Sequence, residues 1–407
     1  MFSQPLHIAL ATHRGSPDMS DIDVMSAARV LEWMRGADER TRRALLTSVA
    51  EPGDLRIAQL VADHGVLETI ERIALPDVMP ELHARLGARL TRSDPVSDLE
   101  KVRRLGGRLV IPGDLEWPTQ LDDLGIATPW ALWIRGSQNL RIAMLRSVAV
   151  VGARACTTYG ARIASDMASD LGSAGWAVVS GGAFGIDAAA HRGALAVNGI
   201  TAAVLACGVD VSYPPRNESM FESIGRDGFL ISEVAPGAVP HRARFLVRNR
   251  VIAALTRGTV VIEAAVRSGS LATARAALDL DRPVLGTPGP ITSPLSSGVH
   301  QILRNGAHLV TSAAEVIEAV GELGQDLAPI PEGARTHLDR IDSVARAVLD
   351  AFPSQGVTSA SDVAREAGVT ANEVLVALTR LELEGLVERR SGGWSIVRRA
   401  VLGGASY

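Results

Sequence analysis

Four short segments of the sequence combine glycine, serine, asparagine and arginine in the manner of anion-binding loops. They are 152–154 (GAR), 180–187 (SGGAFGID), 248–250 (RNR) and 267–273 (RSGSLAT). Each lies where an apolar, strand-like run gives way to a helical pattern, or just beyond it. Helix N-termini present unpaired N–H groups to anions, so these segments predict a surface that holds phosphates at several points.

The segment 241–255 (HRARFLVRNRVIAAL) carries four arginines and no acidic residue. We expect a helix near 248–255, with the arginines at its N-terminus. Cations at that position oppose the helix dipole, which suggests an anionic ligand that offsets the cost. A solvated run of charge is the alternative interpretation.

Asp187 and His191 are four residues apart and share one face of a predicted helix. A catalytic pair would need a nucleophile, and Ser180 is the candidate nearby. We favour the interpretation that Asp187 caps the helix, over catalysis. By the same reasoning Ser270 is a candidate cap, and Glu263 could orient an arginine at the end of the strand 260–262.

Composition excludes little. The chain has 407 residues, 41 basic and 45 acidic, and a net charge of −4, which is ordinary for a globular protein. Its two cysteines show no metal or CxxC spacing, so we predict a reducing, cytoplasmic location, no metal and no cofactor. The apolar runs are too short to span a bilayer, so we predict no membrane partner. An incomplete GxGxxG pattern after the first central strand gives dinucleotide binding little support.

Apolar strand-like runs and helical patterns alternate regularly through the centre of the chain. This order predicts an α/β fold with a Rossmann-like, doubly wound parallel sheet. The predicted strands lie near 147–151, 177–180, 201–205, 229–232, 258–262, 283–287 and 308–310. The predicted helices lie near 159–174, 187–197, 217–225, 248–255, 270–280 and 297–305.

The flanking regions predict two further domains. Residues 1–107 have a helical pattern after about 20 loose residues, which suits a SAM or helix-hairpin-helix domain or a scaffolding bundle. Residues 108–321 form the Rossmann-like domain, and the glycines and prolines of 322–338 predict a linker. Residues 339–407 have the order of a winged helix, with a capping box from Thr370 to Glu373 that opens its third helix.

The central motifs together resemble the DNA-processing protein A family, also called DprA or Smf. The motifs are GAR at 152–154, SGGAFGIDAAAHRGAL at 180–195, GVDVSYPPRN at 208–217, SEVAPG at 232–237, RNRVIA at 248–253 and EAAVRSGSLATA at 263–274. One departure is Leu246-Val247, where the family usually has a proline shortly before RNR.

The resemblance implies a non-enzymatic, dimeric protein that binds single-stranded DNA, protects it and loads the RecA recombinase onto it during natural transformation. It implies backbone contacts by Arg154, Arg248 and Arg250, and a basic position at Arg216. The full predicted phosphate-binding set is Gly152, Arg154, Ser180, Gly181, Gly182, Gly185, Arg216, Arg248, Asn249, Arg250, Arg267, Ser268, Gly269, Ser270 and Thr273.

Two other functions compete with this one. A nucleotide-processing phosphoribohydrolase would need a PGGxGT-type loop and a glutamate pair, whereas this chain has EAAVRSGS after 260–262. A transcription regulator would use the third winged-helix segment, 370–384, in the major groove. That segment has Glu373, Glu382 and Glu384 against Arg380 alone, so phosphate repulsion opposes DNA docking, and we expect this domain to contact protein.

Overall fold

The computed structural model describes residues 27–322, 326–328, 341–353 and 355–397. The expected loose N-terminus and most of the expected linker lie outside the described residues. The chain divides into two compact units, 1–328 and 329–407, each of which is described by itself. None of the described helices is both long and apolar enough to cross a membrane.

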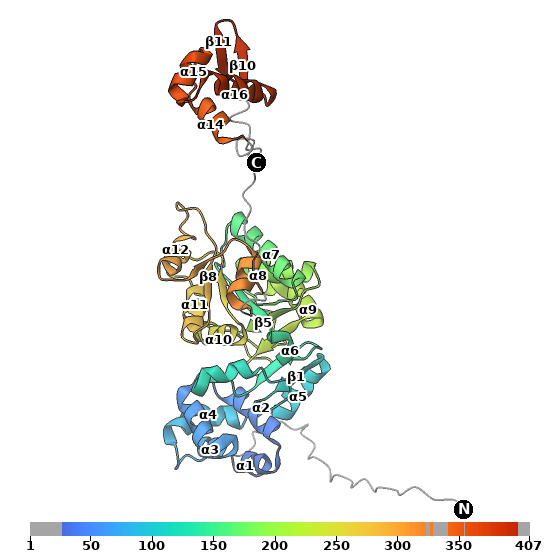
Figure 1. The fold of residues 1–407 in the computed structure, drawn as a ribbon. Helices are drawn as coiled ribbons and strands as arrows, with labels where there is room; N and C mark the ends of the chain where they lie inside the picture. The colour runs from blue at the N-terminus through green and yellow to red at the C-terminus, as the bar shows by residue number, and fades with distance from the viewer. Residues whose placement is uncertain (1–26, 323–325, 329–340, 354, 398–407) are drawn as a thin grey trace, which may run out of the picture. The chain divides into compact units, whose positions relative to one another are not determined.

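A nine-stranded sheet forms the centre of the first unit, in the order β1-β2-β6-β5-β4-β3-β7-β8-β9. Figure 1 shows the ribbon of this unit, with β1, β5 and β8 labelled. The strands from β3 to β9 pair in parallel, and β1 and β2 add an antiparallel edge beside β6. The prediction of a mostly parallel α/β sheet is therefore confirmed. The strands are β1 (Gly107–Val110), β2 (Leu132–Arg135), β3 (Ser147–Val151), β4 (Ala177–Ser180), β5 (Thr201–Leu205), β6 (Phe229–Ser232), β7 (Thr259–Val261), β8 (Val284–Gly286) and β9 (His308–Leu309).

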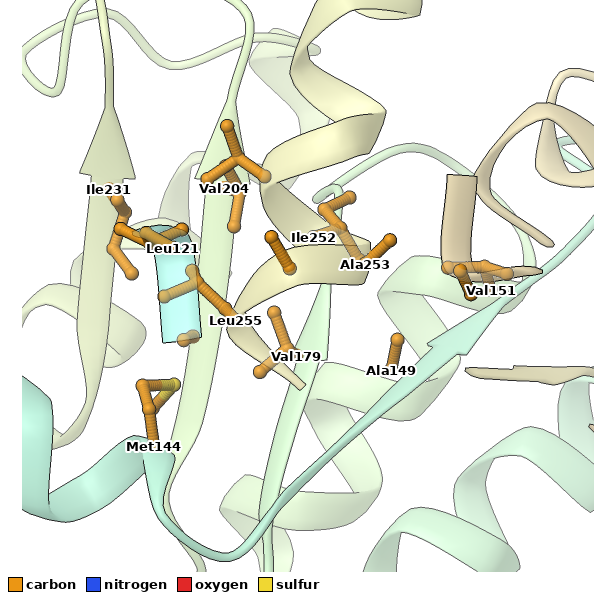
Figure 2. Packing of buried hydrophobic residues seen from close by; sticks show 14 of the residues in the cluster. Leu121, Met144, Ala149, Val151, Val179, Val204, Ile231, Ile252, Ala253 and Leu255 are labelled. Atoms are coloured by element: carbon orange, nitrogen blue, oxygen red, sulfur yellow. The ribbon is translucent and has the colours of Figure 1, made fainter. Parts of the chain in front are cut away.

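Helices bury both faces of this sheet, which explains why its strands are continuous apolar runs. One face carries α7 (Thr158–Ser173), α8 (Ile186–Ala196), α9 (Glu218–Asp227) and α13 (Ala313–Val320). The other carries α10 (Arg242–Leu255), α11 (Ser270–Leu278), α12 (Ser297–Arg304), the short α6 (Leu140–Met144) and the 3-10 helix η1 (Thr119–Ala127). Figure 2 shows the close packing of α10 and its neighbours, with labels on Ile252, Ala253, Leu255, Val179, Val204 and Leu121.

The N-terminal helices pack into their own apolar cluster and also contact the sheet domain. They are α1 (Ala27–Gly36), α2 (Glu39–Val49), α3 (Leu55–Ala74), α4 (Pro80–Leu90) and α5 (Pro95–Arg104). The indole Nε1 of Trp133 in β2 donates to Thr47 in α2 at 3.0 Å. Arg40 forms a two-point ion pair with Asp114, with nitrogen–oxygen distances of 2.9 and 2.8 Å. One buried hydrogen bond and one partly buried ion pair thus join the helical region to the sheet domain.

The second unit has the predicted order of helices followed by a hairpin. Its elements are α14 (Ser343–Asp350), α15 (Ala360–Ala367), α16 (Ala371–Leu383), β10 (Val387–Arg390) and β11 (Gly393–Ile396). The short 3-10 helix η2 (Pro215–Asn217) belongs to the first unit, between β5 and α9. Thr370 and Glu373 form the predicted capping box of α16. Gly385 has a φ of 72°, a left-handed conformation that suits glycine where the helix stops.

The structure differs from the sequence prediction mainly in α10. This helix begins at Arg242, six residues before the expected start, and no side chain caps it at His241. Consequently only Arg242 and Arg244 lie in its first turn, while Arg248 and Arg250 lie in its interior. The argument that all four arginines oppose the helix dipole was wrong for Arg248 and Arg250.

Candidate nucleic-acid interface

From β3 the chain adds β4, β5 and β6 towards one edge of the sheet, and it then returns to the other side of β3 to add β7, β8 and β9. The order of the strands therefore reverses between β3 and β7. In open α/β sheets, ligands bind outside the carboxyl ends of the strands at such a switch point. An open cleft of about 850 Å³ lies there, which we call the switch-point cleft. Its walls are the turn after β3 (residues 151–155), the segment 240–252 that contains most of α10, and the loop 265–273 before and within α11, together with Tyr213.

The cleft brings most of the predicted phosphate-binding residues together. Those that line it are Gly152, Arg154, Arg248, Asn249, Arg267, Ser268, Gly269, Ser270 and Thr273. The predicted residues outside its lining are Ser180, Gly181, Gly182, Gly185, Arg216 and Arg250. Three separate segments of the sequence therefore meet in one place, as the positions of the loops at strand ends predict.

Positive charge dominates the accessible part of the cleft. Arg154, Arg242 and Arg267 line it, and all three are exposed. Among the described residues, none of the three forms an ion pair with an acidic side chain. The one acidic side chain in the lining is Asp187, which is buried beside Arg248. These unpaired guanidinium groups leave the cleft suited to an anion.

Aromatic side chains lie among these cations. The guanidinium carbon of Arg154 lies 4.8 Å from the ring centre of Phe245, and the rings of Phe245 and Tyr213 are 5.8 Å apart at an angle of 51°. Tyr213 is 41% exposed, so one of its faces remains available. Sequence analysis left Phe245, Tyr213, His241 and Arg242 out of the predicted set. A predicted helix start at Arg242 would have put residues 242, 245, 249 and 252 on one face of the helix. Phe245 would then have been recognised as a candidate site residue.

The glycine loop between β4 and α8 binds a carboxyl group of the chain itself, that of Asp187. Burial raises the pKa of Asp187, and the neighbouring Arg248 and the loop's N–H groups oppose that shift. Asp187 Oδ2 accepts the N–H groups of Gly181 and Ala183, at 3.2 and 3.4 Å. Asp187 therefore has a structural role, as expected, but it binds the preceding loop and does not cap α8, whose first residue follows Gly185. Two N–H groups that the sequence suggested for a phosphate are already occupied.

Arg248 is the buried partner of this loop. Its guanidinium donates to the carbonyls of Gly181, at 3.0 Å, and Val204. A Cβ atom on Gly181 would lie 2.5 Å from the guanidinium, so a larger residue there would push Arg248 out of this position. Burial lowers the pKa of Arg248 to about 10, which leaves it charged at neutral pH, and the Asp187 carboxylate opposes that shift. Arg248 thus supports the floor of the cleft and contributes charge from below.

Asn249 connects α10 to the serine loop across the cleft. Its side-chain nitrogen donates to the carbonyl of Gly269 at 3.3 Å, and its oxygen accepts from Arg248 at 3.2 Å. In the serine loop, Ser268 Oγ lies 2.8 Å from Ser270 Oγ and accepts the N–H of Ser270 at 3.4 Å. Ser268, and not Ser270 as expected, is the residue whose hydroxyl binds the start of α11.

Arg250 and Arg216 lie away from the cleft. Arg250 Nη2 donates to Glu233 at 2.6 Å, and both side chains are largely buried. The Nε and Nη1 atoms of Arg250 have no described partner and border a cavity of about 10 Å³ under the N-terminal helices. This position does not suit the expected contact of Arg250 with a DNA backbone. Arg216 is exposed on η2, beyond the residues that line the cleft.

Glu263 fixes the turn after β3 through Thr157. This differs from the prediction that Glu263 orients an arginine. Its carboxylate accepts the backbone N–H of Thr157 at 2.8 Å and the Thr157 hydroxyl at 2.5 Å. Thr157 is the N-cap of α7 and accepts the N–H of Gly160. A Cβ atom on Gly152 would lie 2.6 Å from Ile186, so the turn that carries Arg154 packs tightly on α8. These contacts hold Arg154 at the cleft edge.

Ser180, Asp187 and His191 do not assemble as a catalytic group. Ser180 Oγ donates to the carbonyl of Val150 at 2.7 Å, and His191 Nδ1 lies 2.7 Å from the Thr201 hydroxyl. Burial lowers the pKa of His191 to about 3, which keeps the ring neutral. The ring therefore serves packing and hydrogen bonding in the core.

Comparison with known proteins identifies the family. The model described as DNA recombination-mediator protein A matches residues 108–321, and a DprA winged helix domain matches 332–393. A DprA relative from Mycobacterium tuberculosis is 41% identical over 365 residues, which cover 87% of this chain and 94% of the relative. Protein Smf of Escherichia coli is 38% identical over 299 residues, 72% of this chain and 78% of that protein. The X-ray structure of DprA from Streptococcus pneumoniae is 31% identical, with a TM-score of 0.58 over 69% of this chain and 96% of that one. The chain belongs to the DNA recombination-mediator protein A family, known as DprA or Smf.

Proposed function

We propose that this chain binds single-stranded DNA in the switch-point cleft. The observation that carries the proposal is the set of exposed, unpaired arginines at 154, 242 and 267 around the partly exposed Tyr213 and Phe245. Arginines that follow a sugar-phosphate backbone, with aromatic faces on which bases stack, are the features of sites for single strands. A duplex keeps its bases stacked inside and would leave the aromatic rings unused.

Family membership supports a role for this binding. We propose that the bound strand is protected and passed to the RecA recombinase during natural transformation, by a homodimer in the cytoplasm. The description of the family as a recombination mediator supports the partner, and two cysteines without a disulfide agree with the compartment. In this proposal the chain performs no catalysis.

Replacing Arg154 with alanine tests the proposal. We expect roughly tenfold weaker binding of oligo-dT, a salt slope smaller by about 1, and equal losses for other sequences, because Arg154 contacts phosphate and not base edges. The matched control is Arg162→Ala, which removes an exposed arginine of α7 outside the cleft. The same Arg154 variant should fail to speed RecA filament growth on single-stranded DNA.

Two results would contradict the proposal. One is an Arg154→Ala protein whose affinity and salt slope match those of the wild type. The other is release of ribose from a nucleoside monophosphate, which would favour the phosphoribohydrolase alternative.

A further inference from the structure

Two sides of the helix α10 make different contacts. Residues 242, 245, 248, 249 and 252 line the switch-point cleft. Residues 244, 247 and 250 contact the N-terminal helices, Trp130 or Glu233 on another side of the same helix. The wall that carries Phe245 and Arg242 therefore rests on residues that precede the sheet in sequence.

The contact centres on Glu51, in the turn between α2 and α3. Its two carboxylate oxygens accept from Arg244 Nε at 2.8 Å and Arg244 Nη2 at 3.0 Å, a bidentate pair. Arg89 of α4 donates to the same carboxylate at 3.0 Å, and His241 Nε2 lies 3.3 Å from it. One carboxylate thus joins α4 to the first turn of α10.

This contact is partly buried: the Glu51 side chain is 34% exposed, and Arg244, its bidentate partner, is more buried than Arg89 or His241. Although burial raises it, the pKa of Glu51 falls to about 2 because Arg244, Arg89 and His241 donate to the charged form. The Arg244 side chain is 15% exposed, and its Nη1 also donates to the Val239 carbonyl at 2.8 Å. Next to Glu51, a Cβ atom on Gly53 would lie 2.7 Å from Val247 Cγ1, so the turn packs directly on α10.

The start of α10 needs such support because it lacks a cap of its own. His241 at the N-cap position makes no side-chain capping bond, and the first turn holds Arg242 and Arg244, whose charge opposes the helix dipole. The Glu51 carboxylate supplies the negative charge that this helix start lacks. Without the Glu51 carboxylate, we expect the first turn of α10 to fray, and Phe245 would then lose its position against Arg154.

We propose that Glu51 is a positioning residue for nucleic-acid binding, and that the N-terminal helical region supports the cleft wall through it. The inference rests on the proposed function of the switch-point cleft. Glu51 touches no strand in this scheme. It orders the first turn of α10 before DNA arrives, so that binding does not have to order these side chains.

Removing Glu51 also has an effect that would strengthen DNA binding, because it removes a negative charge near the proposed anion site. That charge is satisfied by three donors and is not part of the cleft lining. We therefore expect the loss of order to outweigh the gain in positive potential.

The test uses the full chain with Glu51→Ala and the milder Glu51→Gln, which keeps an acceptor for Arg244. Glu71→Ala is the matched control, because it removes an ion pair with Arg35 inside the N-terminal helices. We expect Glu51→Ala to bind oligo-dT roughly fivefold more weakly with an unchanged salt slope, and Glu51→Gln to lie between. Amide hydrogen exchange should quicken over 241–247 in both Glu51 variants and stay unchanged over α3.

Opposite results overturn the inference. Unchanged binding by Glu51→Ala, or tighter binding with a steeper salt slope, would show that Glu51 only balances charge. Unchanged exchange over 241–247 in Glu51→Gln would do the same even if Glu51→Ala failed to fold. Failure of the proposed function is distinguishable, because it would appear as wild-type protein that does not bind oligo-dT.

Discussion

Buried ionisable side chains behind the cleft determine how the protein responds to acid. His191 is fully buried, and its pKa is lowered to about 3 from an unfolded value of 6.5 by burial and by the nearby Arg248. Below pH 6.5 the unfolded chain binds a proton at this position that the folded chain does not. The free energy of unfolding therefore falls as the pH drops from 6.5 towards 3. Burial raises the pKa of Asp98 to about 6, which acts in the opposite direction.

Replacing His191 with asparagine isolates the histidine's contribution. Between pH 7.5 and 5.5 the wild type should lose about 1.4 kcal/mol more stability than His191→Asn, which cannot take up the proton. Denaturant unfolding followed by fluorescence of the buried Trp133 and Trp176 measures the difference. Parallel pH dependences in the two proteins would mean that the ring is protonated in the folded state.

At the scale of elements, the strands from β3 to β8 were predictable because each is a mainly apolar run buried on both faces. The strand β2 was missed, since Pro129 and Trp133 were interpreted as packing and turn residues that lead into the central domain. The start of α10 was missed because its first turn carries charge and no cap. Contacts between distant segments, such as Glu263 with Thr157 and Arg248 with Gly181, depend on the fold and leave no local sequence signal.

Glu263 controls how the helix α7 begins. Replacing it with alanine leaves the partly buried N–H and hydroxyl of Thr157 without their acceptor, which should cost about 1 kcal/mol in the free energy of unfolding. Glu263→Gln retains one oxygen acceptor and an amide donor, so it should cost less. Denaturant midpoints of the two variants and the wild type give the order. An alanine variant as stable as the wild type would show that this carboxylate does not hold the helix start.

For the whole molecule, the division into two compact units separates the cleft from the winged helix. The helix α16 carries Glu373, Glu382 and Glu384, and its Arg380 pairs with Asp342 at 2.7 Å. Even the arginine of this helix is therefore engaged by a carboxylate. The neighbouring Val376 and Leu383 are exposed, which favours a protein partner for this unit over phosphate.

Shortening the chain to residues 1–328 tests this separation. Because the cleft and the helices behind it lie within that unit, the affinity for oligo-dT should change less than twofold and the salt slope should not change. Fluorescence anisotropy at several salt concentrations measures both quantities. Loss of binding would assign a DNA contact to the second unit and contradict our expectation for α16.

The carboxylate of Asp187 in the glycine loop has a consequence for competition inside a cell. That loop resembles the turns with which many enzymes hold nucleotides, yet the N–H groups of Gly181 and Ala183 already have an acceptor in Asp187. We therefore expect small metabolites such as ATP to find no phosphate site at these N–H groups and to contact instead the arginines and the serine loop of the switch-point cleft. A polymer engages several of those arginines at once, so long strands prevail over abundant monomers by avidity.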